Sequence, residues 1–149
     1  MTLLVAAAAL LAVGCSENTP TSIETGPNTI HGYVLVHDPD AAWKVDGPCS
    51  PAGPLGDLAE GTDVVVKDGS GKAIGTAELP EGVGEEDEAT DQQDSETHVC
   101  EFPFDVVGVA TTDTYVVQVA DRPAQTVPLE NIKARFWQLF FEFPGPVPR

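Results

Sequence analysis

The chain consists largely of short segments rich in β-branched and aromatic residues, each bounded by Gly, Pro or Asp. Their lengths suit β-strands, and no segment shows the sustained apolar period of a long helix. Only residues 129–134 have the pattern of a short helical turn. About seven strands with such turns predict an all-β fold, a single antiparallel β-sandwich. The predicted strands are residues 29–36, 63–67, 72–79, 100–107, 114–119, 125–129 and 136–143.

Alternation along the first strand indicates which side chains enter the core. It places Ile30, Val34 and Val36 on one face and Tyr33 on the other. A second local signal is the turn sequence at residues 68–71, whose glycines permit the positive backbone angles of a tight hairpin. The strands on either side of this turn are therefore predicted to pair.

The last predicted strand is the most aromatic part of the chain. One face carries Trp137, Leu139, Phe141 and Phe143, and Phe140 lies on the other. We interpret the first face as core, with both faces partly covered. The alternative is an aromatic binding face, because a contiguous exposed apolar patch marks an interaction site.

The N-terminal residues have the pattern of an export signal that ends at a lipidated cysteine. The uncharged run before Cys15 is about 12 residues long and would reach about 18 Å as a helix, well short of a bilayer core of roughly 30 Å. Gly14 followed by Cys15 resembles the lipobox of bacterial lipoproteins. No Lys or Arg precedes the run, so a translation start upstream of Met1 is one interpretation. An ordinary cleaved secretory signal with a chance cysteine is the alternative.

These features divide the chain into four parts. Residues 1–14 are the predicted signal peptide, and residues 15–28 are the acylated cysteine with a flexible linker, which has too few large apolar residues for a core. Residues 29–143 form the β-domain, and residues 144–149 are a Pro-rich tail. We expect the protein at the extracytoplasmic face of the cell membrane, held there by lipid.

With Cys15 assigned to lipid, Cys49 and Cys100 remain as a pair in an oxidising compartment and are predicted to form a disulfide. Closing a loop of about 50 residues removes denatured-chain entropy worth about 4 kcal/mol. A metal site built from Cys49, Cys100 and His98 is the alternative. It is disfavoured because the chain has no C-x-x-C pair.

The strands, turns and cysteines together resemble a small exported β-domain of actinobacterial lipoproteins, and they are broadly similar to transthyretin-like and carboxypeptidase-regulatory-like sandwiches. The resemblance extends over about residues 29–143. It implies an Ig-like or transthyretin-like topology, and it implies no particular activity, since such sandwiches host many. The segments that carry it are residues 47–49, 57–72, 100–104 and 115–119.

The chain carries 24 Asp and Glu against 7 Lys and Arg, for a formal net charge of -17. This balance argues against nucleic acid, whose phosphates would be repelled, and against adhesion to anionic lipid without the acyl anchor. It favours a cationic or neutral partner or a metal ion, and the expected partner is an envelope protein or a cationic ligand. The densest acidic run is residues 85–96, which lacks the internal glycine of a calcium loop. We interpret it as a solvated loop, with ordered calcium binding as the alternative.

Candidate catalytic and metal-binding residues form no recognisable motif. Ser70 lies in the predicted hairpin turn, whereas an acyl-transfer serine needs a strand-to-helix turn and a nearby histidine. His37, Asp38 and Asp40 could supply metal ligands, but Pro39 between them suits the end of a strand. His31 and His98 have no histidine partner at metal-binding spacing.

We therefore expect a lipid-anchored binding or structural module of the cell envelope, without catalysis and without a cofactor. Two alternatives stay open. One is a calcium-dependent adhesion or sensing module that uses residues 85–96. The other is an extracytoplasmic hydrolase with an unrecognised site.

Overall fold

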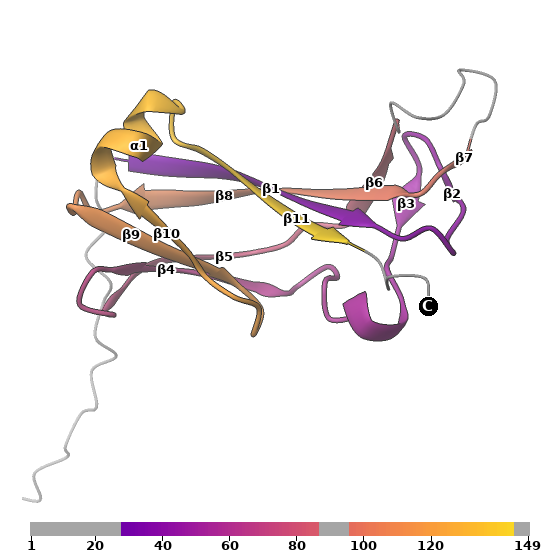
Figure 1. Ribbon diagram of the computed structural model, residues 1–149, viewed down its shortest axis with the longest axis horizontal. Coiled ribbons are helices and arrows are strands. Elements are labelled where there is room, and N and C mark those ends of the chain that lie inside the picture. Colours follow the sequence, from indigo (N-terminus) through magenta and orange to yellow (C-terminus); the bar gives the residue numbers. More distant parts are fainter. Residues whose placement is uncertain (1–27, 87–95, 145–149) are drawn as a thin grey trace, which may run out of the picture.

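Strands make up more than half of the residues that the computed structural model describes, which are 28–86 and 96–144 (Figure 1). The fold is all-β, as the sequence predicts, with one 3₁₀ turn and one short helix in the described ranges. The elements are β1 (Asn28–His37), β2 (Trp43–Lys44), β3 (Pro48–Cys49), η1 (Gly53–Leu55), β4 (Asp63–Asp68), β5 (Ala73–Glu78), β6 (Gly82–Glu85), β7 (Glu96–Thr97), β8 (Val99–Val109), β9 (Thr114–Val119), β10 (Gln125–Pro128), α1 (Leu129–Ala134) and β11 (Gln138–Pro144).

Two main sheets lie face to face in a sandwich-like arrangement (Figure 1). The five-stranded sheet has the order β11-β1-β8-β6-β3, and the four-stranded sheet has the order β10-β9-β4-β5. The short strands β2 and β7 pair separately. The predicted hairpin is present, with β4 and β5 antiparallel and joined by the turn after Asp68.

Apolar side chains from both sheets fill the space between them. Ile30, Val34 and Val36 of β1 are fully buried, as their alternation predicts. Side chains of β8 and of the four-stranded sheet meet them in one continuous cluster. The predicted inner face of the last strand is also core, with Leu139 and Phe141 buried. The other half of each alternating pattern points outward, so the outer face of the five-stranded sheet carries the polar and aromatic residues.

One strand pair departs from the antiparallel arrangement that the sequence predicts. β11 runs parallel to β1, with Tyr33 opposite Phe140 and Leu35 opposite Glu142. The reason is the path of the chain, because β10 leads into α1 at the end where β1 begins (Figure 1). The helix carries the chain from one sheet to the other there. β11 must then start beside the start of β1 and run in the same direction.

The start of β11 also differs from the predicted strand, which began at Phe136. Phe136 and Trp137 both have left-handed backbone angles, with φ of 55° and 63°. Their N–H groups donate to the carbonyls of Lys133 and Ile132, at 3.0 and 2.8 Å, and so end the helix. The indole of Trp137 packs edge-on against Tyr115, at 5.7 Å between ring centroids. Helix termination therefore occupies two residues whose composition is typical of a strand.

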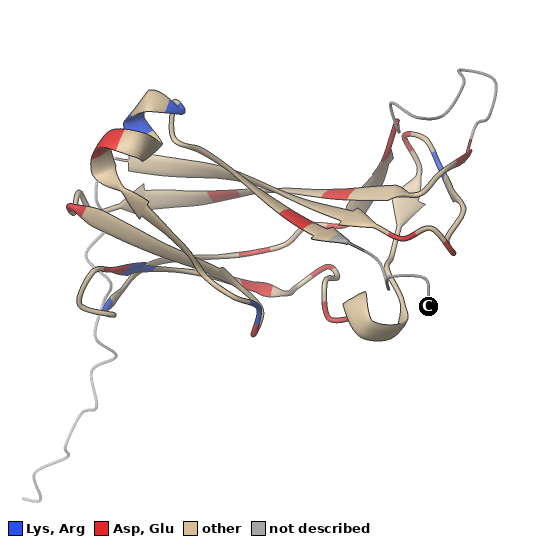
Figure 2. Cartoon of the chain, viewed as in Figure 1, with Lys and Arg blue, Asp and Glu red and all other residues tan. Residues whose placement is uncertain are grey.

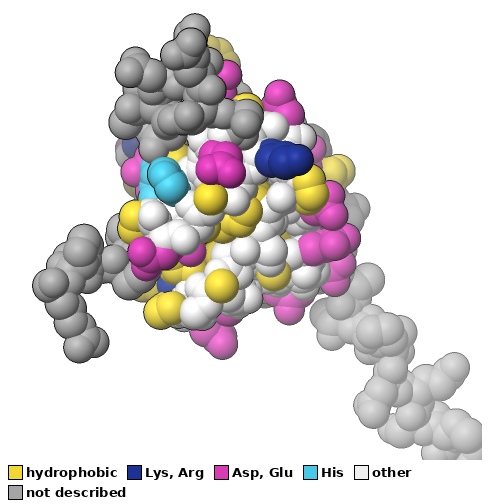
Figure 3. Space-filling view, turned by 90° about the vertical axis from the view of Figure 1, so that its right-hand side faces the viewer, with side chains coloured by type: hydrophobic (Ala, Val, Ile, Leu, Met, Phe, Trp, Pro, Cys, Tyr) yellow, Lys and Arg dark blue, Asp and Glu magenta, His cyan; other side chains and the backbone are white. Residues whose placement is uncertain are grey.

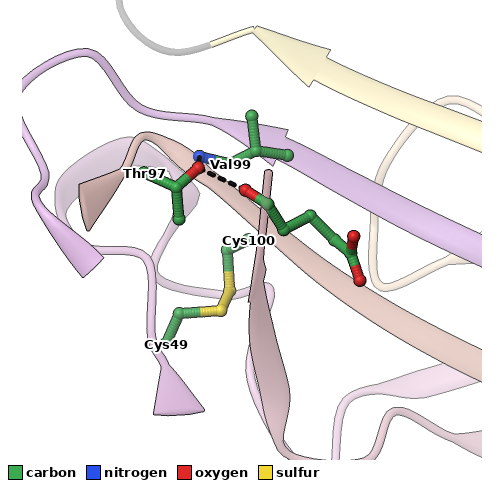
Figure 4. The surroundings of a disulfide bond; sticks show 5 residues. Cys49, Thr97, Val99 and Cys100 are labelled. Carbon is green, nitrogen blue, oxygen red and sulfur yellow. Dashed lines mark hydrogen bonds between the residues drawn. A yellow bond between two sulfur atoms is a disulfide. The ribbon is translucent and has the colours of Figure 1, made fainter. Parts of the chain in front are cut away.

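The structure contains the predicted disulfide between Cys49 and Cys100 (Figure 4). The bond connects β3 to β8 across the intervening strand β6, with 5.8 Å between the two Cα atoms. Gly82 of β6 pairs with Cys49 and leaves the space through which the bond passes. A Cβ atom at Gly82 would lie 2.7 Å from the Cys100 sulfur and 2.7 Å from the Phe102 ring. The crossing therefore requires glycine at this position.

Thr97 fixes the approach to the second cysteine (Figure 4). Its buried hydroxyl donates to the Glu85 carbonyl and accepts a bond from the Val99 N–H at 3.1 Å. These bonds satisfy backbone groups where β8 begins beside β6. They hold the strand that carries Cys100 in register with β6.

Gly82→Ala is expected to lower the free energy of unfolding by about 1–3 kcal/mol, the usual cost of overpacking a filled core. Urea denaturation of the oxidised protein measures the change. The matched control is Gly69→Ala, because a Cβ atom at this exposed glycine would meet only Thr114 at 3.7 Å. A loss at position 82 no larger than at position 69 would contradict the required crossing.

Candidate functional site

The outer face of the five-stranded sheet carries an aromatic stack in which Tyr33 is half-buried and Phe140 is exposed. Strand register places Phe140, Tyr33 and Pro103 side by side on β11, β1 and β8. The Tyr33 and Phe140 rings are stacked, with centroids 5.3 Å apart and planes 13° apart. Phe140 is 51% exposed, and Pro103 is also exposed. The alternative of an aromatic binding face for Trp137, Leu139, Phe141 and Phe143 is wrong, because that face packs into the core; the exposed aromatic residue Phe140 lies on the opposite face of β11.

A hollow of about 430 Å³ lies beside this aromatic stack. Register places Glu142, Leu35 and Glu101 in the next cross-strand row, so an aliphatic side chain lies between two carboxylates. The following row contributes Val99 and Glu85. The hollow has an apolar floor and an acidic rim, and its lining residues are Leu35, His37, Glu85, Glu86, Val99, Glu101 and Glu142.

Partial burial and a neighbouring charge shift the ionisation of one carboxyl of this rim, Glu101. Desolvation raises the pKa of Glu101 above its ordinary value, and the neighbouring charge of Glu85 raises it further. Both causes disfavour the ionised carboxylate. A positively charged group entering the hollow would relieve both effects, because it would replace lost hydration and offset the repulsion.

The ion pairs found in the described ranges lie elsewhere. His31 and Asp105 pair on the same outer face, at 2.6 Å between Nδ1 and Oδ1, and both are largely exposed. The other pair joins Arg122 to Asp57 beside the Phe143 ring of β11. Neither pair includes a carboxylate of the hollow. Within the described ranges, the acidic rim is therefore not neutralised by a salt bridge.

The Arg122 pair is a structural clamp. The guanidinium donates to both carboxylate oxygens of Asp57, to the Pro54 carbonyl at 2.8 Å, and lies over the Phe143 ring at 5.3 Å. The hydrogen bond from Arg122 lowers the pKa of Asp57. This clamp joins the segment around η1, the β9–β10 loop and β11. Its cation is already paired, so we assign it to folding and not to ligand binding.

The candidate nucleophile Ser70 lies in the β4–β5 turn. Its N–H and hydroxyl both bond to Asp68, at 2.9 and 2.6 Å, and Lys72 N–H bonds to the same oxygen at 3.0 Å. The bond from Ser70 is the main reason that the pKa of Asp68 is lowered. The hydrogen bonds recorded for the described chain link no histidine to Ser70. The serine thus closes a turn, as its sequence context suggests.

The candidate metal ligands are placed in separate local interactions. Asp38 is buried, and its carboxylate accepts the Asp40 N–H at 3.1 Å, an arrangement typical of a turn. His37 faces the hollow, and the Nδ1 atom of His98 contacts the Ala41 carbonyl. No group of three or more possible metal ligands occurs in the described ranges. The alternative site with Cys49, Cys100 and His98 is wrong, because the two cysteines are bonded to each other.

Cys15 and the middle of the acidic run, residues 87–95, lie outside the described residues. Lipidation of the cysteine and the calcium alternative for residues 85–96 both stay predictions.

None of the helices in residues 28–86 and 96–144 is long and apolar enough to cross a membrane.

Glu101→Gln is expected to stabilise the protein by about 0.5 kcal/mol near neutral pH, the scale of a partly screened charge interaction. The folded pKa of this acid is raised, so its ionisation destabilises the fold above that pKa. The destabilisation by ionised Glu101 disappears as the pH falls below the ordinary pKa of glutamate, because the carboxyl is then protonated in both the folded and the unfolded state. Thermal melts at several pH values measure the effect. Glu142→Gln, at an exposed position across Leu35, is the control, and an equal gain in both variants would contradict the burial argument.

The chain matches no protein-family model, and comparison with curated proteins and with solved structures found no similar protein.

Proposed function

We propose that this protein is a non-catalytic binding module of the cell envelope, held by a lipid on Cys15 at the extracytoplasmic face of the membrane. The outer face of the five-stranded sheet is its ligand-binding surface. The observation that carries the proposal is the partly exposed Tyr33–Phe140 stack beside an acid-rimmed hollow. The two main sheets then form one β-sandwich domain, which is supported by their shared core cluster.

Two observations support the proposed location. The uncharged run that ends in Gly14-Cys15 has the length and ending of a lipoprotein export signal. The disulfide between Cys49 and Cys100 fits an oxidising compartment, where such bonds persist.

The chemistry of the face favours a cationic ligand. Glu85, Glu101 and Glu142 provide carboxylate acceptors for guanidinium or ammonium groups. The neighbouring aromatic rings attract cations through their π faces and offer apolar contact area. A basic segment of an envelope protein combines both properties. The net charge of -17 adds long-range attraction for such a partner.

Cys15→Ala is expected to move the protein from the membrane fraction to the soluble extracytoplasmic fraction, because the acyl chains would be absent. Membrane fractionation and intact mass of the native protein measure this. An unmodified mass on the native chain, or continued membrane association of the variant, would contradict lipid anchoring.

Binding of an oligo-arginine peptide tests the ligand face. We expect the oligo-arginine peptide to bind more tightly than an oligo-glutamate peptide of equal length. The double variant Glu101→Gln with Glu142→Gln should lower the affinity for oligo-arginine about tenfold or more at physiological salt. Tyr33→Ser with Phe140→Ser should also weaken it, since the aromatic contacts are lost. Isothermal titration calorimetry measures these affinities.

The control removes the same charge from the other sheet, by Asp63→Asn with Glu78→Gln, which are exposed and opposite each other on β4 and β5. A general attraction to an acidic protein would weaken binding equally in both double variants. That result would overturn the assignment of the outer face as the ligand surface.

A further inference from the structure

The end of the molecule where β1 begins gathers three segments that are distant in sequence. Asn28 donates from its side chain to Thr111 Oγ1 at 2.9 Å, in the loop between β8 and β9. The Asp113 carbonyl of that loop accepts the Leu129 N–H at 2.9 Å at the start of α1. Asp68, at the β4–β5 turn, pairs with Tyr115 just after the loop. We call residues 67–72, 110–114 and 129–137, together with Asn28, the basic end.

Charge is distributed unequally between this end and the rest of the molecule (Figure 2). The basic end holds four of the six Lys and Arg residues in the described ranges, but three of their eighteen Asp and Glu residues. The four cations are Lys67, Lys72, Lys133 and Arg135, and the three acids are Asp68, Asp113 and Glu130. Figure 3, which views the opposite end, shows Asp and Glu side chains spread across it. A strongly acidic protein thus presents one end with a small cationic excess.

Phe136 projects from the basic end in a conformation that the fold does not favour. Its side chain is 83% exposed, the largest value among the exposed large apolar residues of the described chain. Its φ of 55° lies in the left-handed region, which glycine or asparagine would adopt at lower cost after a helix. The neighbouring Trp137 explains the turn through its contact with Tyr115. Nothing in the fold explains a phenylalanine at position 136, beside Arg135 and near Lys133.

The N-terminal segment enters the described structure at this same end. Asn28 opens β1, and Cys15 precedes it by thirteen positions. The flexible linker that the sequence predicts here would have an end-to-end distance of about 20 Å. β1 itself is ten residues long, about 33 Å as a strand. A lipid on Cys15 would therefore keep the basic end nearer to the bilayer than the acidic end.

We propose that the basic end docks on the anionic lipid surface, with Phe136 among the headgroups and Lys133, Arg135 and the β4–β5 turn against their phosphates. This inference rests on the proposed lipid anchoring. Lys and Arg are attracted to anionic lipid within about one Debye length, roughly 8 Å at physiological salt, and aromatic side chains favour the interface. The acid-rich end then lies several Debye lengths away. In this orientation the long strands run away from the membrane, along the bilayer normal. The outer face of the five-stranded sheet is then parallel to the normal and open to a partner.

Hydrogen exchange on vesicles tests this orientation. The purified full chain is reconstituted in vesicles of phosphatidylcholine alone, or with 30% phosphatidylglycerol, and flotation reports anchoring separately. If the chain does not float by itself, Cys15 is coupled to a maleimide-bearing lipid, so docking is tested whether or not anchoring is natural. We expect amides of residues 129–137 to exchange about tenfold more slowly on the anionic vesicles. Amides of residues 38–47, at the opposite end, should exchange equally on both.

Two variants remove the interaction without disturbing the core. The double variant Lys133→Glu with Arg135→Glu reverses two exposed charges. The variant Phe136→Asn removes the aromatic ring and introduces a residue that tolerates the left-handed backbone angle. Both should abolish the protection while flotation is unchanged, whereas Lys44→Glu, at the opposite end, should retain it. Equal exchange of residues 129–137 on the two vesicle types would overturn the proposal. Loss of protection in the Lys44→Glu variant would overturn it as well, because the effect would then reflect net charge alone.

Discussion

The pairing of β1 with β8 is the interaction on which the rest of the structure depends. It runs from Asn28 opposite Val109 to His37 opposite Val99, and both strands also pair with a further neighbour. Because side chains alternate, this single register decides which residues form the core and which face outward. A shift by one residue would bury Tyr33 and expose Val34. The core and the candidate ligand face are therefore two consequences of the same hydrogen-bonded ladder.

Sequence reasoning predicted the long elements well, because their signals are local. β9 and α1 have the predicted bounds, and the β4–β5 hairpin follows from the glycines of its turn. The short strands β2, β3, β6 and β7 were missed, since two to four residues are too few to show a period. The disulfide and β6 hold β3, β6 also pairs with β8, and β2 and β7 pair with each other. The parallel pairing of β11 was missed for a related reason, since strand direction depends on the route taken by the chain between sheets.

The candidate site was accessible from sequence only in part. The alternation in the last strand set Phe140 apart from its core-facing neighbours, but it did not predict the stack with Tyr33, which strand register creates. The acidic rim could not be foreseen, because Glu85, Glu101 and Glu142 are far apart in the chain and meet only through strand register. The left-handed conformation of Phe136 was likewise not predicted, because the sequence pattern of residues 136–143 is typical of a continuous strand. Long-range strand pairing creates the stack and the rim, and helix termination creates the conformation of Phe136.

The disulfide has a further consequence for the connectivity of the molecule. The chain between Cys49 and Cys100 begins and ends in the five-stranded sheet, and it includes β4 and β5 of the other sheet. With the bond formed, this part of the chain is a closed covalent ring that passes through both layers. A single cut of the backbone within the ring would leave both layers joined by one continuous covalent path. The bond therefore keeps a singly nicked protein in one piece, so that a cut within this ring would release neither layer.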